Sequence, residues 1–309
     1  MSNGAKVTET KERAPAAGVQ RQRSLWGEVW RRLKKNKLAL AGLAFILGLL
    51  LIAVGTIVID TAGKQSVYND YVIKQNLRLR LQGPSVRYPF GLDEFGRNIL
   101  LRMLWAVRYS LFMGTAAIIM STVVGGILGA LAGYYGKIAD NGIMRFMDVL
   151  LAIPSMLLAT AIVAALGTSL INVLIAISIA YIPTFARTIR ASVLTIKDQE
   201  YIEAARALGA GDLRIIFKYI IPNSMAPLIV QATLGVAGAI LSIAGLSFLG
   251  LGIQPPTPEW GSMLSGARSY IRDGWHITVI PGLGIMLTIL ALNVLGDGLR
   301  DALDPRLKT

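Results

Sequence analysis

Three aspartates near the C-terminal end of the sequence come closest to a cluster that could perform catalysis or hold a metal ion. Asp297, Asp301 and Asp304 lie within eight residues of one another. Grouped carboxylates can bind a hard cation or transfer protons. However, Arg300 lies among these aspartates, and Pro305 ends any helix that carries them. We therefore interpret the group as the polar end of the chain, with contact to a partner protein as the alternative.

Other sequence motifs of enzymes are incomplete. Gly136-Lys137 would need a glycine at position 131 and Ser or Thr at position 138 to form a phosphate-binding loop, but the chain has Leu131 and Ile138. The single histidine, His276, cannot form a zinc motif, and the chain has no cysteine. We therefore expect no catalytic residue, no bound cofactor and no metal in this chain.

Two further carboxylates lie in a short polar segment between apolar runs. Asp140 and Asp148 are eight residues apart, and Arg145 lies between them. We expect them to be solvated in a loop, because this spacing and the neighbouring arginine suit acid–base catalysis poorly.

Residues 200–222, EYIEAARALGAGDLRIIFKYIIP, differ from a plain membrane span because their apolar residues alternate with charged ones. The first half predicts a short helix. Four of its residues share one face at positions i, i+3, i+4 and i+7: Tyr201, Ala204, Ala205 and Leu208. Gly209 suits the position just after a helix, and Asp212 suits the N-cap of a second helix.

The second half of this stretch repeats the helical spacing. Its apolar positions are Leu213, Ile216, Phe217 and Ile220. Pro222 is expected to stop the run. Two short helices joined by a glycine-containing bend exceed what a simple turn between membrane spans requires.

The small side chains of the first helix suggest what its face is for. Ala204 and Ala205 let another protein approach closely, and Glu203 offers a charge for orientation. The alternative is an interfacial helix that rests on the bilayer. Such a helix usually carries Trp, Phe or several Leu, whereas this one offers mainly small residues. The pattern alone leaves both interpretations open.

The same residues resemble a known motif. Glu203-Ala204-Ala205, Gly209 and Pro222 are similar to the "EAA" loop of bacterial ABC-importer permeases, E-A-A-x3-G-x9-I-x-L-P. Tyr219 replaces Ile and Ile221 replaces Leu in this pattern, and both changes keep a large, largely apolar side chain. The resemblance implies a coupling helix that docks on an ATP-hydrolysing subunit through the following residues: Tyr201, Glu203, Ala204, Ala205, Arg206, Leu208 and Gly209.

Three more segments resemble one subfamily of these permeases. Residues 90–98, FGLDEFGRN, are similar to the F-G-T-D-x-x-G-R-D stretch of the dipeptide, oligopeptide and nickel importers. Residues 254–261, QPPTPEWG, resemble the same subfamily, and residues 296–306, GDGLRDALDPR, resemble specifically its C-type permease subunit. The resemblance extends over nearly all of the chain from about Trp26 onward.

Composition independently predicts a membrane protein. Hydrophobic residues make up 54% of the 309 residues and charged residues only 16%, against about 25% charged in soluble domains. The apolar residues form long runs. The net charge of +13 lies mostly beside these runs, where it favours a role in topology and attraction to lipid headgroups over nucleic-acid binding.

The apolar runs predict six transmembrane helices in an all-α integral membrane protein. The expected spans are about 38–59, 109–132, 149–166, 169–186, 225–249 and 277–295. At about 1.5 Å rise per residue, runs of roughly 20 residues cross a hydrocarbon core of about 30 Å. Before the first span, Leu25, Trp26, Val29, Trp30 and Leu33 predict one apolar face of a basic amphipathic helix.

Basic residues set the expected topology. Seven Lys or Arg residues between Arg21 and Lys37 place the start of the first span in the cytoplasm. The stretch 187–222 is also basic and is expected inside. The connection 60–108 is expected outside although it is basic as well, which works against the rule.

Polar and small residues within the spans indicate packing or a pathway. Gly125, Gly129 and Gly133 repeat every four residues, which predicts close helix packing. Gln231 and Asn172 are candidate pathway residues, since polar side chains in spans tend to face the bundle or a pore. A hydrogen-bonded packing role is the alternative for Gln231.

The resemblance implies the following organisation. Residues 1–37 form a cytoplasmic tail with the basic helix, 38–59 the first transmembrane helix, and 60–108 an extracytoplasmic connection. Residues 109–299 form a five-helix permease core with the coupling loop 187–222, and 300–309 form a cytoplasmic tail. The implied fold is that of type I ABC importer permeases, in a bacterial or archaeal plasma membrane with both termini in the cytoplasm.

The resemblance also implies the partners. They are a homologous permease subunit forming a heterodimer, two cytoplasmic ATPase subunits that use ATP and Mg, an extracytoplasmic solute-binding protein and membrane lipids. The implied solute is a dipeptide or oligopeptide, with nickel or a solute such as glutathione as the alternative. An ion-coupled secondary transporter and a membrane-embedded enzyme are less consistent, because neither intramembrane carboxylates nor a nucleophile–base pair is evident.

Overall fold

The computed structural model describes residues 25–63 and 65–303, and within them the regular structure is helical apart from one isolated bridge between Leu92 and Asn98. The α-helices are α1 (Leu25–Leu33), α2 (Lys37–Ala62), α3 (Ile99–Tyr135), α4 (Lys137–Ala152), α5 (Ser155–Leu166), α6 (Leu170–Ile196), α7 (Glu200–Ala207), α8 (Asp212–Ile215), α9 (Ile221–Asn223), α10 (Met225–Phe248), α11 (Trp260–Ala267) and α12 (Trp275–Leu303). Short π or 3-10 segments cover Tyr68–Ile73, Leu77–Leu79, Ile216–Ile220 and Arg268–Tyr270. The predicted all-α fold is confirmed.

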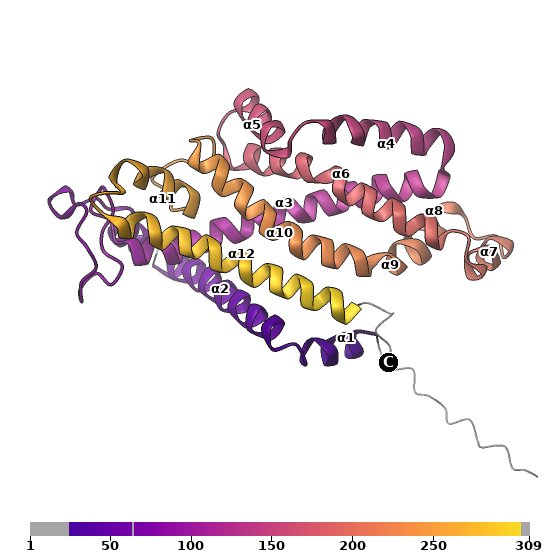
Figure 1. Ribbon diagram of the computed structural model, residues 1–309, viewed down its shortest axis with the longest axis horizontal. Coiled ribbons are helices and arrows are strands. Elements are labelled where there is room, and N and C mark those ends of the chain that lie inside the picture. Colours follow the sequence, from indigo (N-terminus) through magenta and orange to yellow (C-terminus); the bar gives the residue numbers. More distant parts are fainter. Residues whose placement is uncertain (1–24, 64, 304–309) are drawn as a thin grey trace, which may run out of the picture.

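The long helices run side by side along an elongated bundle, with α7 at one end and α11 at the other (Figure 1). We call these the α7 end and the α11 end. Residues 1–24 of the expected tail 1–37 and the last six residues of the expected segment 300–309 lie outside the described residues, as do the side chains of Leu25 and Trp26.

The membrane spans agree with the expected number when one bent pair is counted as a span. Five helices are long and apolar enough to cross a bilayer: α2, α3, α6, α10 and α12. The sixth is the pair α4 and α5, whose axes are bent by 89° against each other. Expecting 149–166 as a continuous helix was therefore wrong. The backbone of Ile153 is extended, with φ −96° and ψ 126°. The cause is the following Pro154, whose ring disfavours the helical region for the residue before it.

The second span begins earlier than its apolar composition suggested. α3 starts at Ile99, whereas the expected span started near Tyr109. Residues 99–108 of the expected connection are therefore helical. Asn98 is the N-cap, and its side-chain oxygen accepts a hydrogen bond of 3.4 Å from the backbone N–H of Leu101. The polar side chains of Arg102 and Arg108 made this first part of α3 look unlike a span.

Glycines allow the central helices to approach closely. A Cβ atom at Gly125 would lie 2.6 Å from the carbonyl oxygen of Ile182, and one at Gly129 would lie 2.2 Å from that of Ala186. A Cβ at Gly133 would lie 2.8 Å from the Cβ of Val193. The predicted packing role of this stripe is therefore confirmed, since α3 packs along α6 through it.

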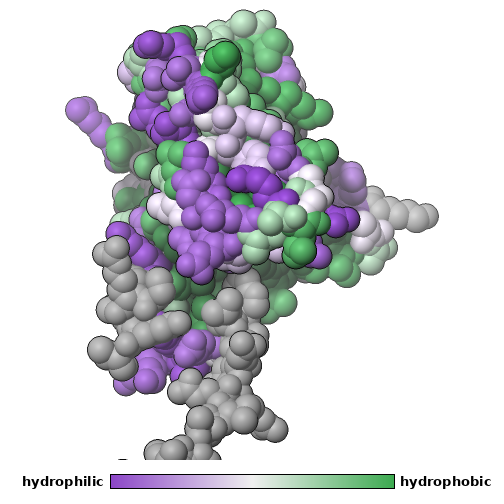
Figure 2. All heavy atoms as spheres, turned by 90° about the vertical axis from the view of Figure 1, so that its right-hand side faces the viewer, coloured by the Kyte–Doolittle hydropathy of each residue, from purple (hydrophilic) through white to green (hydrophobic). Residues whose placement is uncertain are grey.

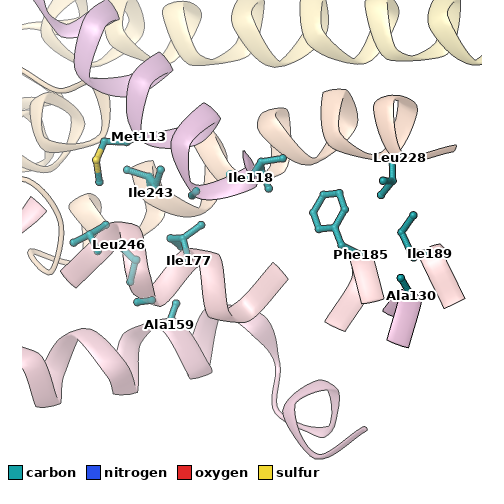
Figure 3. Close-up of a cluster of buried hydrophobic side chains, with 14 of the residues drawn as sticks. Met113, Ile118, Ala130, Ala159, Ile177, Phe185, Ile189, Leu228, Ile243 and Leu246 are labelled. Atoms are coloured by element: carbon teal, nitrogen blue, oxygen red, sulfur yellow. The ribbon is translucent and has the colours of Figure 1, made fainter. Parts of the chain in front are cut away.

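The main core lies among α3, α5, α6 and α10. Figure 3 shows part of it, including the following buried residues: Met113, Ile118, Ala159, Ile177, Phe185, Ile189, Ile243 and Leu246. A second cluster joins α2, α3, α10, α11 and α12. On α2, by contrast, Leu38 and Leu51 are 71% and 74% exposed, as expected for a helix that faces lipid.

Candidate functional site

α7 and the segment after it form the candidate site, and they project at the α7 end between α6 and α10 (Figure 1). α7 ends at Ala207, Leu208 is its C-cap, and Gly209 follows with φ +81°. The backbone N–H of Ala210 donates to the carbonyl of Ala205 at 3.0 Å, which closes the helix end. Gly209 therefore occupies the predicted position. A Cβ there would meet nothing within 4 Å, so only the left-handed backbone requires glycine.

Most of the residues expected on α7 are exposed. Tyr201 is 43% exposed and Leu208 89% exposed. Three further residues of the motif are also exposed: Glu203, Ala204 and Arg206. The expected shared face was partly wrong, because Ala205 turns inward and is only 8% exposed. The exposed residues form what we call the docking face: Tyr201, Glu203, Ala204, Arg206 and Leu208.

Ile202 anchors this helix, and sequence reasoning missed it. Its side chain is fully buried in the main core, beside Ala205 on the inward side of α7. The signal was present, because Ile202 and Ala205 are three residues apart and Ile202 is the aliphatic residue of the first turn. The resemblance to the EAA loop assigned roles to its neighbours on α7 and none to Ile202.

The segment after the bend departs from the expected second helix. Gly211, not Asp212, is the N-cap of α8, and no side chain caps it. Asp212 is instead the first helical residue, and its Oδ1 accepts a hydrogen bond of 2.7 Å from the hydroxyl of Tyr134. The guanidinium of Arg206 lies 6.0 Å from the centroid of the Tyr134 ring. Tyr134 of α3 thus contacts both halves of the candidate site.

The expected apolar face of that second helix is divided between two sides. Ile216 and Ile220 are buried, whereas Leu213 and Phe217 are 66% and 57% exposed. Residues 216–220 are π-helical, so their turn is wider than the 3.6 residues assumed by the spacing. Pro222 does not stop the run, because it occupies the first turn of α9, where its missing N–H is tolerated.

Two ion pairs connect α4 with α6 near the α7 end. Arg190 forms a two-pronged contact with Asp140, with distances of 2.5 Å from Nε to Oδ1 and 2.6 Å from Nη2 to Oδ2. Arg187 lies 2.6 Å from Asp148, and this pair is half exposed. The two aspartates are therefore helical and paired across to α6, which corrects the expectation of a solvated loop.

The candidate pathway residues do not come together. Asn172, near the start of α6, donates its side-chain amide to the carbonyls of Leu166 and Gly167 at 2.7 and 3.1 Å, and so closes the turn after α5. Gln231 of α10 is half-buried and lines a cavity of about 460 Å³ with Arg300 and Thr188. The geometry supports a structural role for Asn172, and a pathway role for either residue stays a prediction.

Figure 2 shows the molecule from the α7 end, where hydrophilic side chains gather in the middle of the view and apolar and hydrophilic ones are mixed around them. This distribution suits a surface that meets water or a protein. It differs from the sides of the bundle, where helices such as α2 expose leucines and valines.

At the α11 end, a buried charge network holds the loop before α3. The Oδ1 atom of Asp93 accepts hydrogen bonds of 2.9 Å from the backbone N–H groups of Phe95 and Arg97. Its Oδ2 atom accepts one of 2.6 Å from the Nε of Arg97. Gly91 and Gly96 have φ of +74° and +71°, which the tight turn requires. This explains the residue types of the motif at 90–98.

A second buried carboxylate at this end starts α11. Glu259 is 1% exposed and accepts hydrogen bonds of 2.9 and 2.8 Å from the N–H groups of Gly261 and Ser262. Burial raises the pKa of Glu259, although these two hydrogen bonds oppose the shift. The segment 254–261 thus supplies a helix cap, and the peptide bond between Pro255 and Pro256 is cis.

Comparison with known proteins gives two family matches. Residues 125–309 match the model described as "Binding-protein-dependent transport system inner membrane component". Residues 24–84 match the model described as "N-terminal TM domain of oligopeptide transport permease C".

Among similar curated proteins, the "Dipeptide transport system permease protein DppC" of Alkalihalophilus pseudofirmus is 48% identical over 93% of this chain and 91% of that protein. The "Di/tripeptide transport system permease protein DppC" of Pseudomonas aeruginosa is 47% identical over 91% and 92%. The "Glutathione transport system permease protein GsiD" of Escherichia coli is 43% identical over 95% of each chain.

Among solved structures, a chain of the inward-facing MetNI methionine ABC transporter is similar, with a TM-score of 0.55 and 20% sequence identity. The match covers 67% of this chain and 98% of that chain. At this identity the likeness concerns the fold alone.

Proposed function

Because this chain belongs to the family of binding-protein-dependent transport system inner membrane components, we propose that it is the permease subunit of an ATP-driven importer for dipeptides or short oligopeptides. The chain is a transport permease of the inner membrane with the type I ABC importer fold, as expected. The observation that carries the proposed mechanism is the exposed docking face on α7, held at the end of the bundle by a buried isoleucine.

The docking face binds a cytoplasmic ATPase subunit in this proposal. Ala204 provides a flat surface, Leu208 supplies an apolar contact, and Glu203 and Arg206 orient the partner through their charges. This chain binds no nucleotide; ATP and Mg are used by two ATPase subunits, one for each permease subunit. Closure of the ATPases displaces α7, and the packed helices then move as a rigid body.

A homologous permease subunit covers the apolar surface of the bent pair α4–α5. Phe146, Val149 and Leu157 of this pair are 59%, 57% and 61% exposed. Such a surface, next to the main core, suits a helix–helix interface.

A solute-binding protein delivers the solute at the α11 end, which in this proposal is extracytoplasmic, whereas the chain termini are cytoplasmic.

The paired arginines of the α11 end support this orientation. Arg97 and Arg102 lie against Asp93, and Arg108 lies 2.6 Å from Asp60. These cations are compensated inside the protein, so they weigh less in the positive-inside rule than free loop charges do. The basic character of the connection therefore conflicts less with an outside location than its sequence suggested.

The test is reconstitution of the complete complex in vesicles. The complex is purified from its native membrane, its partners are identified by mass spectrometry, and uptake of dialanine is measured with and without ATP. We expect ATPase subunits and a second permease to co-purify, and uptake to require ATP. Uptake driven by an ion gradient without ATP, or by this chain alone, contradicts the proposal.

Glutathione is the second candidate solute, because the relative from Escherichia coli named for glutathione transport is 43% identical over 95% of this chain. Competition distinguishes the two solutes. Excess unlabelled glutathione should leave dialanine uptake unchanged if short peptides are the solute, and nickel uptake in the same vesicles should be absent.

A further inference from the structure

A cavity of about 350 Å³ lies at the α11 end, apart from the docking face. Its walls come from the loop before α3, from the end of α10 with the residues that follow it, and from α11. Phe95 is 37% exposed, and Gln254 and Gly250 are also exposed, so the cavity opens to the surroundings. Its size falls in the range of roughly 300–1,000 Å³ that is usual for small-molecule sites.

Charges of both signs line this cavity: Asp93, Arg97 and Arg102 are buried, and Glu94 is partly buried. Arg97 is engaged with both carboxylates, at 2.6 Å to Asp93 and 3.3 Å to Glu94. The two carboxylates and two guanidiniums sum to zero charge. An ion of either sign would therefore bring an uncompensated charge into a largely buried site, which is costly.

Arg102 has spare donors. It is 3% exposed, its Nη1 donates to the carbonyl of Pro256 at 3.3 Å, and its Nε lies 3.4 Å from Asp93 without a hydrogen bond. Its Nη2 has no hydrogen-bond partner in the described part of the chain. A buried guanidinium with unused donors is unusual, because unsatisfied buried polar groups cost free energy. A carboxylate in the cavity would satisfy it in the geometry that arginine favours.

Glu94 offers the complementary group. One of its oxygens accepts from Arg97, and the same oxygen lies so close to α11 that a Cβ at Gly266 would be 2.7 Å from it. The other oxygen makes no hydrogen bond to another residue that the structure describes. A ligand ammonium could bind this oxygen.

Apolar side chains form the rest of the wall. They include Ile99, Ile253, Met263 and Ile277, all of them buried. Such surfaces suit short aliphatic groups between the two charged ends of a ligand.

We propose that this cavity binds a small zwitterion with a short apolar body, with its carboxylate on Arg102 and its ammonium on Glu94. Short peptides have this chemistry, so the inference rests on the proposed function and extends it to direct contact between this subunit and the solute. The cavity then receives solute at the α11 end before the solute enters the space between the two permease subunits.

A ligand series tests the charge requirement without changing the protein. Binding of dialanine, dialanine amide and N-acetyl-dialanine to the complete complex, without the solute-binding protein, is measured by titration calorimetry. We expect dialanine to bind, and each blocked form, which lacks one charge, to bind at least tenfold more weakly. Equal binding of the three compounds would overturn the proposal.

A matched pair of variants tests the location. Ser265 lines the cavity, and Ser265→Trp should fill it and abolish dialanine binding. Gln75 is exposed near the same end and does not line the cavity, so Gln75→Trp should bind like the unchanged protein. Thermal unfolding of both variants checks that they fold.

Arg102→Lys keeps the charge but loses the fork of donors, and we expect it to fold and to bind dialanine at least tenfold more weakly than the unchanged protein.

The outcomes separate this inference from the proposed function. If Ser265→Trp folds and binds dialanine with unchanged affinity, the cavity is not the site, although ATP-dependent dialanine uptake by the unchanged complex still supports peptide import. If the unchanged complex binds dialanine in the cavity but does not transport it, the proposed solute is wrong while the zwitterion site is supported.

Discussion

The hydroxyl of Tyr134, next to the last residue of α3, donates a hydrogen bond of 2.7 Å to the carboxylate of Asp212, the first residue of α8. This bond connects the segment after the docking face directly with the longest helix of the bundle. α3 in turn packs closely along α6 through its glycines. In the proposed mechanism, a partner that displaces α7 and α8 would therefore move two spans at once.

Tyr134→Phe should weaken this transmission without unfolding the protein. Removal of one exposed hydrogen bond should cost about 0.5–1.5 kcal/mol at most, while the number of peptides taken up per ATP hydrolysed should fall. The measurement is uptake and ATP hydrolysis in the same vesicles. Tyr135→Phe is the control, because the Tyr135 hydroxyl has no hydrogen bond within the described residues. Equal ratios for both variants would show that the bond has no part in coupling.

Ala204→Trp should leave the protein inserted in the membrane but uncoupled. Ala204 is exposed on the docking face, so the fold has room for the indole, whereas a partner seated closely on α7 does not. Uptake should fall at least tenfold at normal expression, and co-purification of the ATPase should decrease. Ala204→Ser, a small change at the same position, should transport normally. Full uptake by the Trp variant would argue against docking at this residue.

Much of the fold could be predicted from residue type and spacing. The long apolar runs predicted the spans because burial in lipid depends on composition, and Gly125, Gly129 and Gly133 predicted the contact of α3 with α6. Gly209 was also predictable, since a left-handed residue after a helix strongly favours glycine.

The misses concern side chains whose partners are distant in sequence. Asp140 forms an ion pair with Arg190, fifty residues away in sequence, and Arg108 forms one with Asp60, forty-eight residues away. Neither pair has a local signal, so the aspartate looked solvated and the arginine looked like a loop charge. The bend at Pro154 was missed because apolar composition continues through it, although the backbone does not.

Glu259→Gln should change how stability depends on pH. Burial raises the pKa of the folded-state carboxyl above its ordinary 4.5, so the folded protein holds this proton more tightly than the unfolded chain. Stability from this group is therefore fully present below pH 4.5 and is lost as pH rises through the folded-state pKa. As pH rises over that range, the melting temperature of the Gln variant should decline less than that of the unchanged protein.

Glu200→Gln, at an exposed position, is the control for that comparison and should follow the unchanged protein. If Glu259→Gln and the unchanged protein lose stability in parallel as pH rises, another group is responsible for the dependence.

Gly209→Val should impair both stability and coupling, and Gly211→Val should impair neither to the same extent. Neither glycine has an atom within 4 Å of an added Cβ, so the two sites differ in backbone rather than in space. Gly209 has φ +81°, which costs an ordinary residue roughly 1–2 kcal/mol, whereas Gly211 has φ −70°. Uptake assays and thermal unfolding compare them, and indistinguishable variants would refute the conformational explanation.

Gly129→Ala should be strongly destabilising, although it adds a single methyl group. The new Cβ would lie 2.2 Å from the backbone carbonyl oxygen of Ala186, and a backbone atom of a packed helix cannot move aside like a flexible side chain. Overpacking of this kind typically costs about 1–3 kcal/mol. Gly126→Ala on the same helix meets nothing within 4 Å and should be neutral or slightly stabilising, since alanine favours helix. Thermal unfolding in detergent measures both, and a Gly129 variant as stable as the Gly126 variant would mean that α3 and α6 are farther apart than described.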